Sequence, residues 1–216
     1  MDPKFWHEQW ELNQIGFHQH NIHPFLREYW SRVASGKGQV FVPLCGKSLD
    51  MVWLREEGHD ILGVDLSPLA VADFFKEQGL PVSILSTDDF QGYESDGFEL
   101  LSGDFFELRS HHLAKVTAVY DRAALIAMPP HLQIRYAQHL LSVLPHHPPI
   151  LLITFEYSET EMQGPPFSVT EQRVNELFGQ VYSIEKLSSI DALELQPGLK
   201  NRGLSSLTEK VYHLHV

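Results

Sequence analysis

The sequence has a single cysteine, Cys45, and few basic residues. One cysteine excludes an intramolecular disulfide and any zinc site built from several cysteines. Lysine and arginine together number 16 against 28 aspartate and glutamate residues, so the formal net charge is -12. A surface this acidic repels phosphate backbones and anionic lipids, which argues against nucleic acids and membranes as the main partners.

Long apolar runs are also missing. No stretch approaches the roughly 20 apolar residues that a helix needs to cross a bilayer. The residues up to Glu11 carry charges throughout, unlike a signal peptide, so we expect a cytoplasmic protein. No repeat, low-complexity tract or linker divides the 216 residues, of which 43% are hydrophobic. The composition predicts one domain over residues 1–216.

The N-terminal segment, residues 1–34, is expected to form a helical region. Asp2-Pro3 is typical of a helix start, with an N-cap and a proline in the first turn. Trp6 and Trp10 are four positions apart and share one helical face. Such a helix either packs on the core or covers a ligand as a lid, and the pattern favours neither.

The loop that follows contains Phe17 and three histidines, His18, His20 and His23. The spacing of these histidines fits no zinc-binding pattern, and we predict no metal site in the chain. Phe17 is a candidate for the wall of a pocket.

The chain is organised around Val40 to Ser48, an apolar run that stops at Gly46 and gives way to a helical pattern from Leu49. This predicts a strand, a tight turn and a helix. The run ends in Gly46-Lys47-Ser48, but a P-loop requires glycine where Phe41 stands. Gly46 is also the only glycine of the turn, which excludes the dinucleotide fingerprint.

Asp65 ends the second apolar run, about 20 positions beyond Gly46, at the separation from which a carboxylate reaches the two ribose hydroxyls of a nucleoside. The alternative is that Asp65 only caps the helix that begins at Ser67-Pro68 and closes at Gly79. A ribose-binding acid without a phosphate cradle suggests a nucleoside ligand without phosphates. S-Adenosylmethionine is the commonest such cofactor.

Two later strands deliver further candidates. Phe98 to Ser102 ends at Gly103-Asp104, where an acid with an apolar neighbour would hold an adenine ring; a simple turn is equally compatible with the pattern. The strand 115–120 ends at Asp121-Arg122. Either these two residues form a salt bridge, or the guanidinium of Arg122 lies in the cleft. Two alternating C-terminal strands, 181–190 and 208–215, predict a hairpin with an antiparallel strand at the sheet edge.

Four segments together resemble the bacterial thiopurine S-methyltransferases, and the resemblance covers nearly the whole chain. They are Trp6-x-x-x-Trp10 with Gly16-Phe17-His18, the run V-P-L-C-G-K-S-L-D-M at 42–51, D-R-A-A-L at 121–125 and G-P-P-F at 164–167. The resemblance implies a class I methyltransferase that uses S-adenosylmethionine. The expected fold is a three-layer α/β/α sandwich with a mostly parallel seven-stranded sheet, an antiparallel edge strand and an N-terminal lid helix.

The resemblance also implies roles for individual residues. The cofactor contacts would be Trp10, Leu44, Gly46, Asp65, Asp104, Phe105 and Arg122. The substrate would contact Trp6, Phe17, Phe167 and Arg122. Asp65 stands where many members carry the longer glutamate, which leaves ribose binding plausible. The loop 195–203 resembles the family only loosely, so Arg202 is no more than a candidate.

The implied reaction is transfer of a methyl group to the sulfur of a thiopurine or a related aromatic thiol. An aromatic thiol is acidic enough to arrive as a thiolate, so no nucleophilic residue or strong base is needed, and Cys45 is interpreted as turn packing. Two alternatives stay open: an acceptor of another kind, such as a selenium or tellurium species, or a nucleoside-binding module without catalysis. We expect a monomer with a small-molecule substrate.

Overall fold

The computed structural model describes residues 3–87 and 89–216. Asp2, expected to cap the first helix, lies outside them. The helices are α1 (Pro3–Glu11), α2 (Pro24–Val33), α3 (Leu49–Glu56), α4 (Pro68–Gln78), α5 (Pro130–Val143), α6 (Glu171–Phe178) and α7 (Pro197–Asn201), with 3₁₀ turns η1 (Phe105–Glu107) and η2 (Leu125–Ala127). The strands are β1 (Gln39–Pro43), β2 (Asp60–Asp65), β3 (Ser83–Ser86), β4 (Gln91–Ser95), β5 (Phe98–Ser102), β6 (Val116–Arg122), β7 (Ile150–Glu156), β8 (Ser183–Asp191) and β9 (Thr208–His215).

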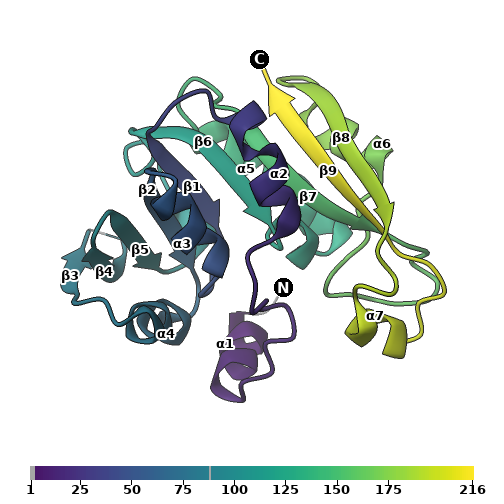
Figure 1. Ribbon diagram of the computed structural model, residues 1–216, viewed down its shortest axis with the longest axis horizontal. Coiled ribbons are helices and arrows are strands. Elements are labelled where there is room, and N and C mark those ends of the chain that lie inside the picture. Colours follow the sequence, from purple (N-terminus) through teal and green to yellow (C-terminus); the bar gives the residue numbers. More distant parts are fainter. Residues whose placement is uncertain (1–2, 88) are drawn as a thin grey trace.

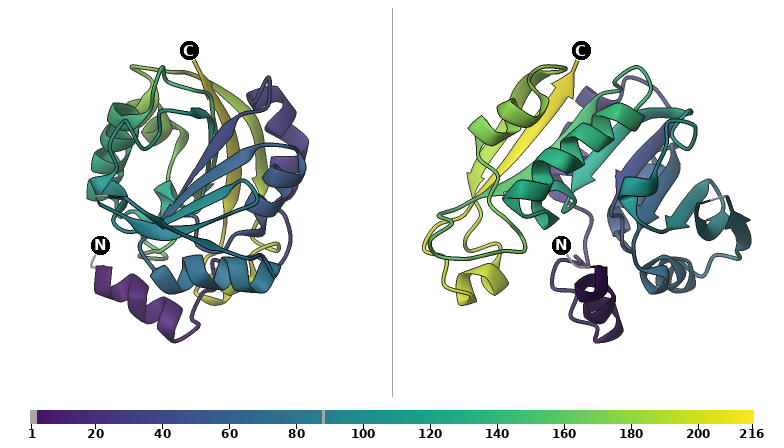
Figure 2. Two further views of the ribbon diagram at one scale, coloured as in Figure 1. Left: turned by 90° about the vertical axis from the view of Figure 1, so that its left-hand side faces the viewer. Right: turned by 180° about the vertical axis from the view of Figure 1, so that it is seen from behind.

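One sheet runs through the molecule in the order β3-β4-β5-β2-β1-β6-β7-β9-β8. The five strands from β5 to β7 are parallel. Helices α2, α3 and α4 pack on one face in one hydrophobic cluster, and α5 and α6 pack on the other in a second cluster. Figure 1 and the rear view of Figure 2 show these two layers. The expected α/β sandwich is confirmed. None of the helices described in the structure combines the length and apolarity that a bilayer crossing requires.

The described part of the chain forms nine strands in this sheet, two more than the seven expected. The sequence predicts a short strand at residues 81–84 and a loop or weak hairpin over residues 86–97, and the structure forms β3 and β4 there as part of the sheet. The dipeptide Asp96-Gly97 joins β4 to β5 with φ of 45° and 81°, which is the positive-φ pair of a two-residue hairpin turn. An Asp-Gly pair is a hairpin signal, and here it resolves the alternatives of loop and weak hairpin in favour of the hairpin.

The predicted C-terminal hairpin, β8 and β9, lies at the edge of the sheet, and β9 is its antiparallel strand. β9 is inserted between β7 and β8 and pairs antiparallel with both, so the edge strand β8 runs parallel to β7. β9 is largely buried, whereas β8 is mostly exposed. Burial explains the order: the more apolar strand occupies the inner position, although it comes last in the chain.

Local signals at the helix ends agree with the structure. Ser48 caps α3 by accepting from Asp50 N–H, and Ser67 caps α4 by accepting from Ala70 N–H. Gly79 ends α4 in the left-handed conformation. Both helices therefore begin directly after the carboxyl ends of β1 and β2, and this places their N-terminal turns around the same edge of the sheet.

Candidate active site

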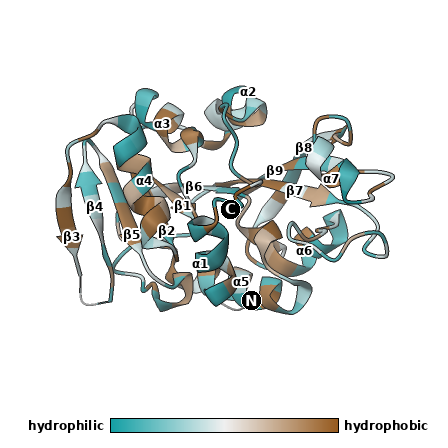
Figure 3. Ribbon diagram, turned by 90° about the horizontal axis from the view of Figure 1, so that it is seen from below, coloured by the Kyte–Doolittle hydropathy of each residue, from teal (hydrophilic) through white to brown (hydrophobic). Residues whose placement is uncertain are grey.

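A cavity of about 790 Å³ opens at the carboxyl ends of the parallel strands. Its walls come from the strand ends, from α1 with the loop after it, and from the α7 segment. Figure 1 shows α1 and α7 on this side of the sheet, and Figure 3 shows α1 in front of the sheet when the molecule is seen from below. This is the edge at which open α/β sheets bind ligands.

Most residues predicted for the site meet in this cavity. Its lining includes Trp6, Trp10, Phe17, Leu44, Asp65, Asp104, Phe105, Arg122 and Arg202. Gly46 and Phe167 are not among the lining residues. Phe167 packs its ring against Gly164 and donates its N–H to Ile126 O at 2.6 Å, while the preceding Pro165 and Pro166 line the wall in its place.

Asp65 joins the turn after β1 to the turn after β2. Its Oδ2 accepts from Gly46 N–H and its Oδ1 from Ser67 N–H, each at 2.8 Å. Both interpretations of this residue thus find support, because the carboxylate holds the start of α4 and also lines the cavity. Burial raises the pKa of Asp65 to about 6, against the opposing effect of the two amide hydrogen bonds.

The backbone around Asp65 leaves room for a ligand. A carboxylate has about four lone-pair directions, and the two amides use two of them. Leu44 and Gly46 adopt positive φ of 47° and 50°, an uncommon conformation for leucine that holds the turn close to the strand end. The spare acceptor capacity and the tight turn together fit a nucleoside whose ribose hydroxyls donate to Asp65.

Asp104 and Phe105 occupy the next strand end. Asp104 Oδ1 accepts from Phe106 N–H at 2.9 Å and so caps the 3₁₀ turn η1. The Phe105 ring stacks on Tyr136, with centroids 4.8 Å apart, and is buried apart from the part that lines the cavity. The pair therefore offers a flat apolar surface beside a carboxylate. The turn interpretation of Asp104 and the ligand interpretation are compatible here.

Asp121 and Arg122 have separate tasks. Asp121 is buried and bonds Tyr136 O–H at 2.7 Å and Leu125 N–H at 3.1 Å. Its interactions fix the loop after β6, and burial raises the pKa of Asp121 to about 6. No ion pair joins it to Arg122 among the described contacts. Arg122 lines the cavity, as the second of the two interpretations predicts.

An aromatic group closes the cavity from the N-terminal side. The Phe17 ring lies 5.6 Å from the rings of both Trp6 and Trp10, each in an edge-to-face arrangement. Trp10 in turn covers the turn at Gly46, where an added Cβ would come within 3.0 Å of the indole. α1 therefore sits over the strand ends and the cavity, the position expected of a lid, and contributes little to the two main hydrophobic clusters.

Sequence reasoning missed several lining residues. Arg135 places its guanidinium 3.9 Å from the centroid of Phe106, and both side chains line the cavity. Glu209 on β9 lines it too, although it is buried. No local motif marks these residues. Arg135 lies in an ordinary amphipathic helix, and the alternation of apolar and polar residues around Glu209 predicts only a strand.

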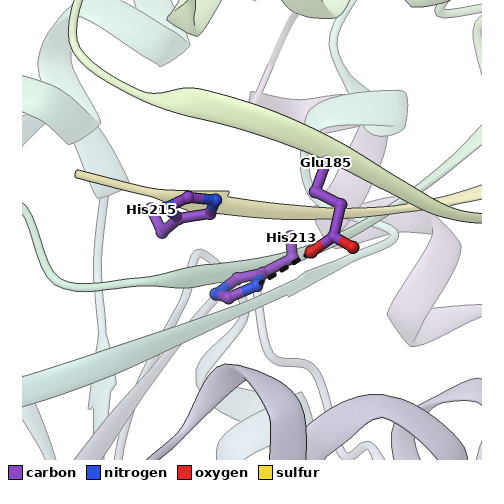
Figure 4. Close-up of side chains that lie close together, drawn as sticks. All are labelled: Glu185, His213 and His215. Atoms are coloured by element: carbon purple, nitrogen blue, oxygen red, sulfur yellow. Dashed lines mark ion pairs between the residues drawn. The ribbon is translucent and has the colours of Figure 1, made fainter.

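A second group of titratable side chains lies away from the cavity, on the β8–β9 hairpin. Figure 4 shows Glu185, His213 and His215 with the ion pair between the first two, 3.8 Å long. Their potential ligand atoms lie within 4.8 Å of one another, whereas zinc ligands stand roughly 3.4 Å apart. Arg32 already bonds Glu185 at 2.8 Å, so we assign no metal to this group.

Cys45 serves packing, as expected. It is buried, and burial raises the pKa of its thiol well above the usual value. A Cβ on the facing Gly63 would come within 2.7 Å of the sulfur. The thiol therefore fills the space left by a strand glycine and is unsuited to act as a nucleophile.

Comparisons with known proteins agree with this architecture. The sequence model of the family "Thiopurine S-methyltransferase (TPMT)" matches residues 1–216. A thiopurine S-methyltransferase of Methylococcus capsulatus is 54% identical over 99% of this chain and 97% of its own. One from Pseudomonas fluorescens is 46% identical over 99% of both chains.

Solved structures show the same fold at much lower identity. A 1,6-didemethyltoxoflavin-N1-methyltransferase of Burkholderia thailandensis, solved with 1,6-didemethyltoxoflavin and S-adenosylhomocysteine, gives a TM-score of 0.66 at 14% identity over 99% of this chain and 87% of its own. The magnesium protoporphyrin IX methyltransferase of Synechocystis PCC 6803, solved with S-adenosylhomocysteine, gives 0.64 at 13% over 97% and 99%. The protein is an S-adenosylmethionine-dependent methyltransferase, and the chain belongs to the thiopurine S-methyltransferase family.

Proposed function

We propose that this methyltransferase acts on the sulfur of thiopurines or related heteroaromatic thiols. The observation that carries the proposal is that the cavity is lined both by an aromatic wall, formed by Trp6, Trp10 and Phe17, and by the cationic Arg122. A flat aromatic ring fits such a wall, and an anionic or electron-rich sulfur fits the guanidinium. The curated relatives named above bear the same activity in their names.

The assignment of the cofactor-binding residues is part of the proposal. Asp65 accepts hydrogen bonds from the ribose, and Asp104 with Phe105 holds the adenine ring by an edge and a face. Trp10 covers the turn between Leu44 and Gly46, along which the nucleoside lies. When bound, S-adenosylmethionine supplies the electrophilic methyl group of a sulfonium.

The chain itself contributes orientation and a dry environment. A thiolate and a sulfonium lose their charges as the methyl is transferred, so surroundings that exclude water favour the transition state over the solvated reactants. The edge-to-face rings of α1 and its loop exclude water from one side of the cavity. Alignment of the sulfur with the methyl group supplies much of the remaining rate enhancement.

Two measurements on the wild-type protein test the proposal. Calorimetry with S-adenosylhomocysteine measures cofactor binding, and a methyl-transfer assay compares 6-mercaptopurine with benzenethiol and selenite. Cofactor binding with transfer to 6-mercaptopurine supports the proposal. Transfer only to selenite would favour a soft inorganic acceptor, and binding without any transfer would favour a nucleoside-binding module; either result would refute the thiopurine assignment.

A further inference from the structure

A buried carboxylate in the cavity wall has no role in the reaction described so far. Glu209 is 5% exposed, lies near the start of β9 and lines the cavity. Its Oε1 is 3.1 Å from Nε2 of His23, a residue 186 positions earlier. Burying a carboxylate is costly unless it has partners, so its position calls for an explanation.

The geometry around His23 fixes which atoms of the pair donate. Phe25 N–H donates to Nδ1 of His23 at 3.3 Å, so Nδ1 acts as an acceptor and Nε2 is the atom that donates to Glu209 Oε1. His23 N–H donates to Asp50 Oδ1 at 2.8 Å, which holds the residue at the start of α2. Glu209 is therefore oriented by a donor that is itself held in place, and Oε2 has no hydrogen-bond partner within the described residues.

Glu209 shares a face of the sheet with Arg122. Arg122 pairs with Ile153, and Ile153 pairs with Val211, so these three side chains point to one side. Glu209 lies two residues before Val211 on β9 and points to the same side. Two strand spacings and two residues separate Glu209 from Arg122, roughly 12 Å between Cα atoms. The cavity thus has a donor-only and an acceptor-only side chain on either side of Ile153.

This pair matches a heteroaromatic thione, in which a ring N–H lies beside a C=S group. The sulfur accepts from Arg122 and the ring N–H donates to Glu209. A neutral thione is a weaker nucleophile than its anion while the proton stays on nitrogen, because the sulfur carries only part of a negative charge. A carboxylate at the N–H edge removes that obstacle.

We propose that Glu209 is the proton acceptor for neutral heteroaromatic thiones, an inference that rests on the function proposed above. The ring N–H bond breaks and an O–H bond forms on Oε2; the electron pair of the N–H bond becomes the π bond between nitrogen and the ring carbon, and the C=S π pair moves onto sulfur. The sulfur then bonds the transferred methyl, and the electron pair of the broken sulfonium bond stays on S-adenosylhomocysteine. Glu209 releases its proton to water after the product leaves.

The step applies only to substrates that carry the proton on nitrogen. A thiol that reaches the cavity already ionised needs no base, so Glu209 sets specificity between two classes of acceptor. The consequence is measurable as a ratio: kcat/KM for 2-thiopyridone, which has a ring N–H beside C=S, divided by kcat/KM for benzenethiol, which has no ring nitrogen.

The test compares wild type with Glu209→Gln, which keeps the shape of the side chain and removes its basicity. The ratio is expected to fall on the order of 100-fold, and to recover toward the wild-type value at alkaline pH, where the thione ionises in solution. Glu156→Gln is the matched control: Glu156 lies at the same sheet edge, pairs with Lys210 at 2.6 Å and is not among the cavity-lining residues, so its ratio stays at the wild-type value.

Other results would overturn the proposal. An equal loss on both substrates, a loss that alkaline pH does not relieve, or an unchanged ratio would each show that Glu209 is not the acceptor. Glu209→Asp has a carboxylate on a side chain one carbon shorter, so its ratio is expected to stay closer to the wild-type value than that of Glu209→Gln. If Glu209→Gln does not fold, Glu209→Asp serves as the test variant. S-Adenosylhomocysteine affinity and the melting temperature, measured on each variant, identify a purely structural defect.

Failure of the proposed function gives a different pattern. If wild type methylates neither 2-thiopyridone nor benzenethiol, calorimetry of 2-thiopyridone on the complex with S-adenosylhomocysteine tests the contact, and the transfer assay on 6-mercaptopurine decides the proposed function separately. Binding that weakens about tenfold in Glu209→Gln supports the hydrogen bond to the ring N–H. Equal binding by wild type and variant overturns it.

Discussion

Gly46 N–H donates to Asp65 Oδ2 at 2.8 Å, so the turn after β1 and the end of β2 are held together by one hydrogen bond. The proposed ribose acid is therefore positioned by the same glycine turn that is proposed to contact the nucleoside. A change in the backbone at Gly46 or in the ionisation of Asp65 is therefore expected to change the affinity for the cofactor, and the first two predictions concern these two changes.

Cofactor affinity is expected to depend on pH through Asp65. In the proposed binding mode, ribose hydroxyls donate to the ionised carboxylate, whose pKa in the free protein is about 6. Affinity for S-adenosylhomocysteine is therefore full above pH 6 and falls by up to tenfold per pH unit below it. Calorimetry at pH 7.5 and pH 5 measures the difference. Asp65→Asn binds more weakly and loses this pH dependence; if the variant keeps the full dependence, another group is responsible.

Gly46→Ala is expected to weaken both the fold and cofactor binding. Residue 46 has φ of +50°, and its Cβ would meet the Trp10 ring at 3.0 Å, so the substitution strains the turn and displaces the lid. The backbone cost is about 1–2 kcal/mol. Denaturant unfolding and S-adenosylhomocysteine calorimetry measure the two effects. Gly36→Ala is the control, because it has no atom within 4 Å of its Cβ and no positive φ; equal behaviour of the two variants would contradict the prediction.

Arg122→Ala is expected to raise the KM for a thiopurine, or the dissociation constant of the cofactor, by about 10- to 100-fold. This corresponds to a hydrogen bond to a charged group, about 1.5–3 kcal/mol. Arg122→Lys recovers only part of the loss, since an ammonium lacks the planar donor pair. Steady-state kinetics and calorimetry separate the two effects. The exposed Arg27 on α2 provides the control substitution, and kinetics of Arg122→Ala like those of Arg27→Ala would remove Arg122 from the site.

Phe17→Ala is expected to loosen α1 without unfolding the domain. The Phe17 ring makes one edge-to-face contact with each of Trp6 and Trp10, about 0.5–1.5 kcal/mol apiece. Hydrogen exchange of residues 3–11 should therefore accelerate, while the melting temperature changes little. Leu12→Ala, at a side chain that is 64% exposed, leaves the exchange unchanged. A large drop in melting temperature for Phe17→Ala would show that α1 is part of the core instead.

Tyr136→Phe is expected to destabilise the protein more at neutral than at acidic pH. The folded pKa of Asp121, about 6, exceeds its usual value of 3.8, so the stability it contributes is full below pH 4 and is lost as pH rises through 6. The Tyr136 hydroxyl donates to Asp121 Oδ2 and limits this loss by stabilising the ionised form.

Without that hydroxyl, the free energy of unfolding should fall by about 1.5–3 kcal/mol at pH 7.5 and by less at pH 4.5. Urea unfolding at the two pH values measures the difference. Tyr182→Phe is the matched control, because its hydroxyl donates to the carbonyl of Pro148, which does not titrate. The same pH dependence in both variants would contradict the role of Asp121.

Local patterns in the sequence determined the parts of the site that depend on short segments. Gly46, Ser48 and Ser67 predicted the turn and the two helix starts from their neighbours alone, because caps and tight turns involve backbone groups only a few residues apart. The strand ends at Asp65, Asp104 and Arg122 followed from the rule that parallel strands end at one edge. Asp65, Asp104 and Arg122 all line the cavity.

Only the tertiary structure decided which distant segments meet. Three features join residues that are far apart in the chain: β9 lies between β7 and β8, Trp10 of α1 packs over Gly46, and His23 contacts Glu209. Such contacts depend on which burial arrangement of the whole chain is most favourable, and no local spacing encodes them. The sequence alone thus determined the strand-end residues that are proposed to bind the nucleoside, and the packing of the sheet decided that the buried carboxylate of Glu209 lines the same cavity.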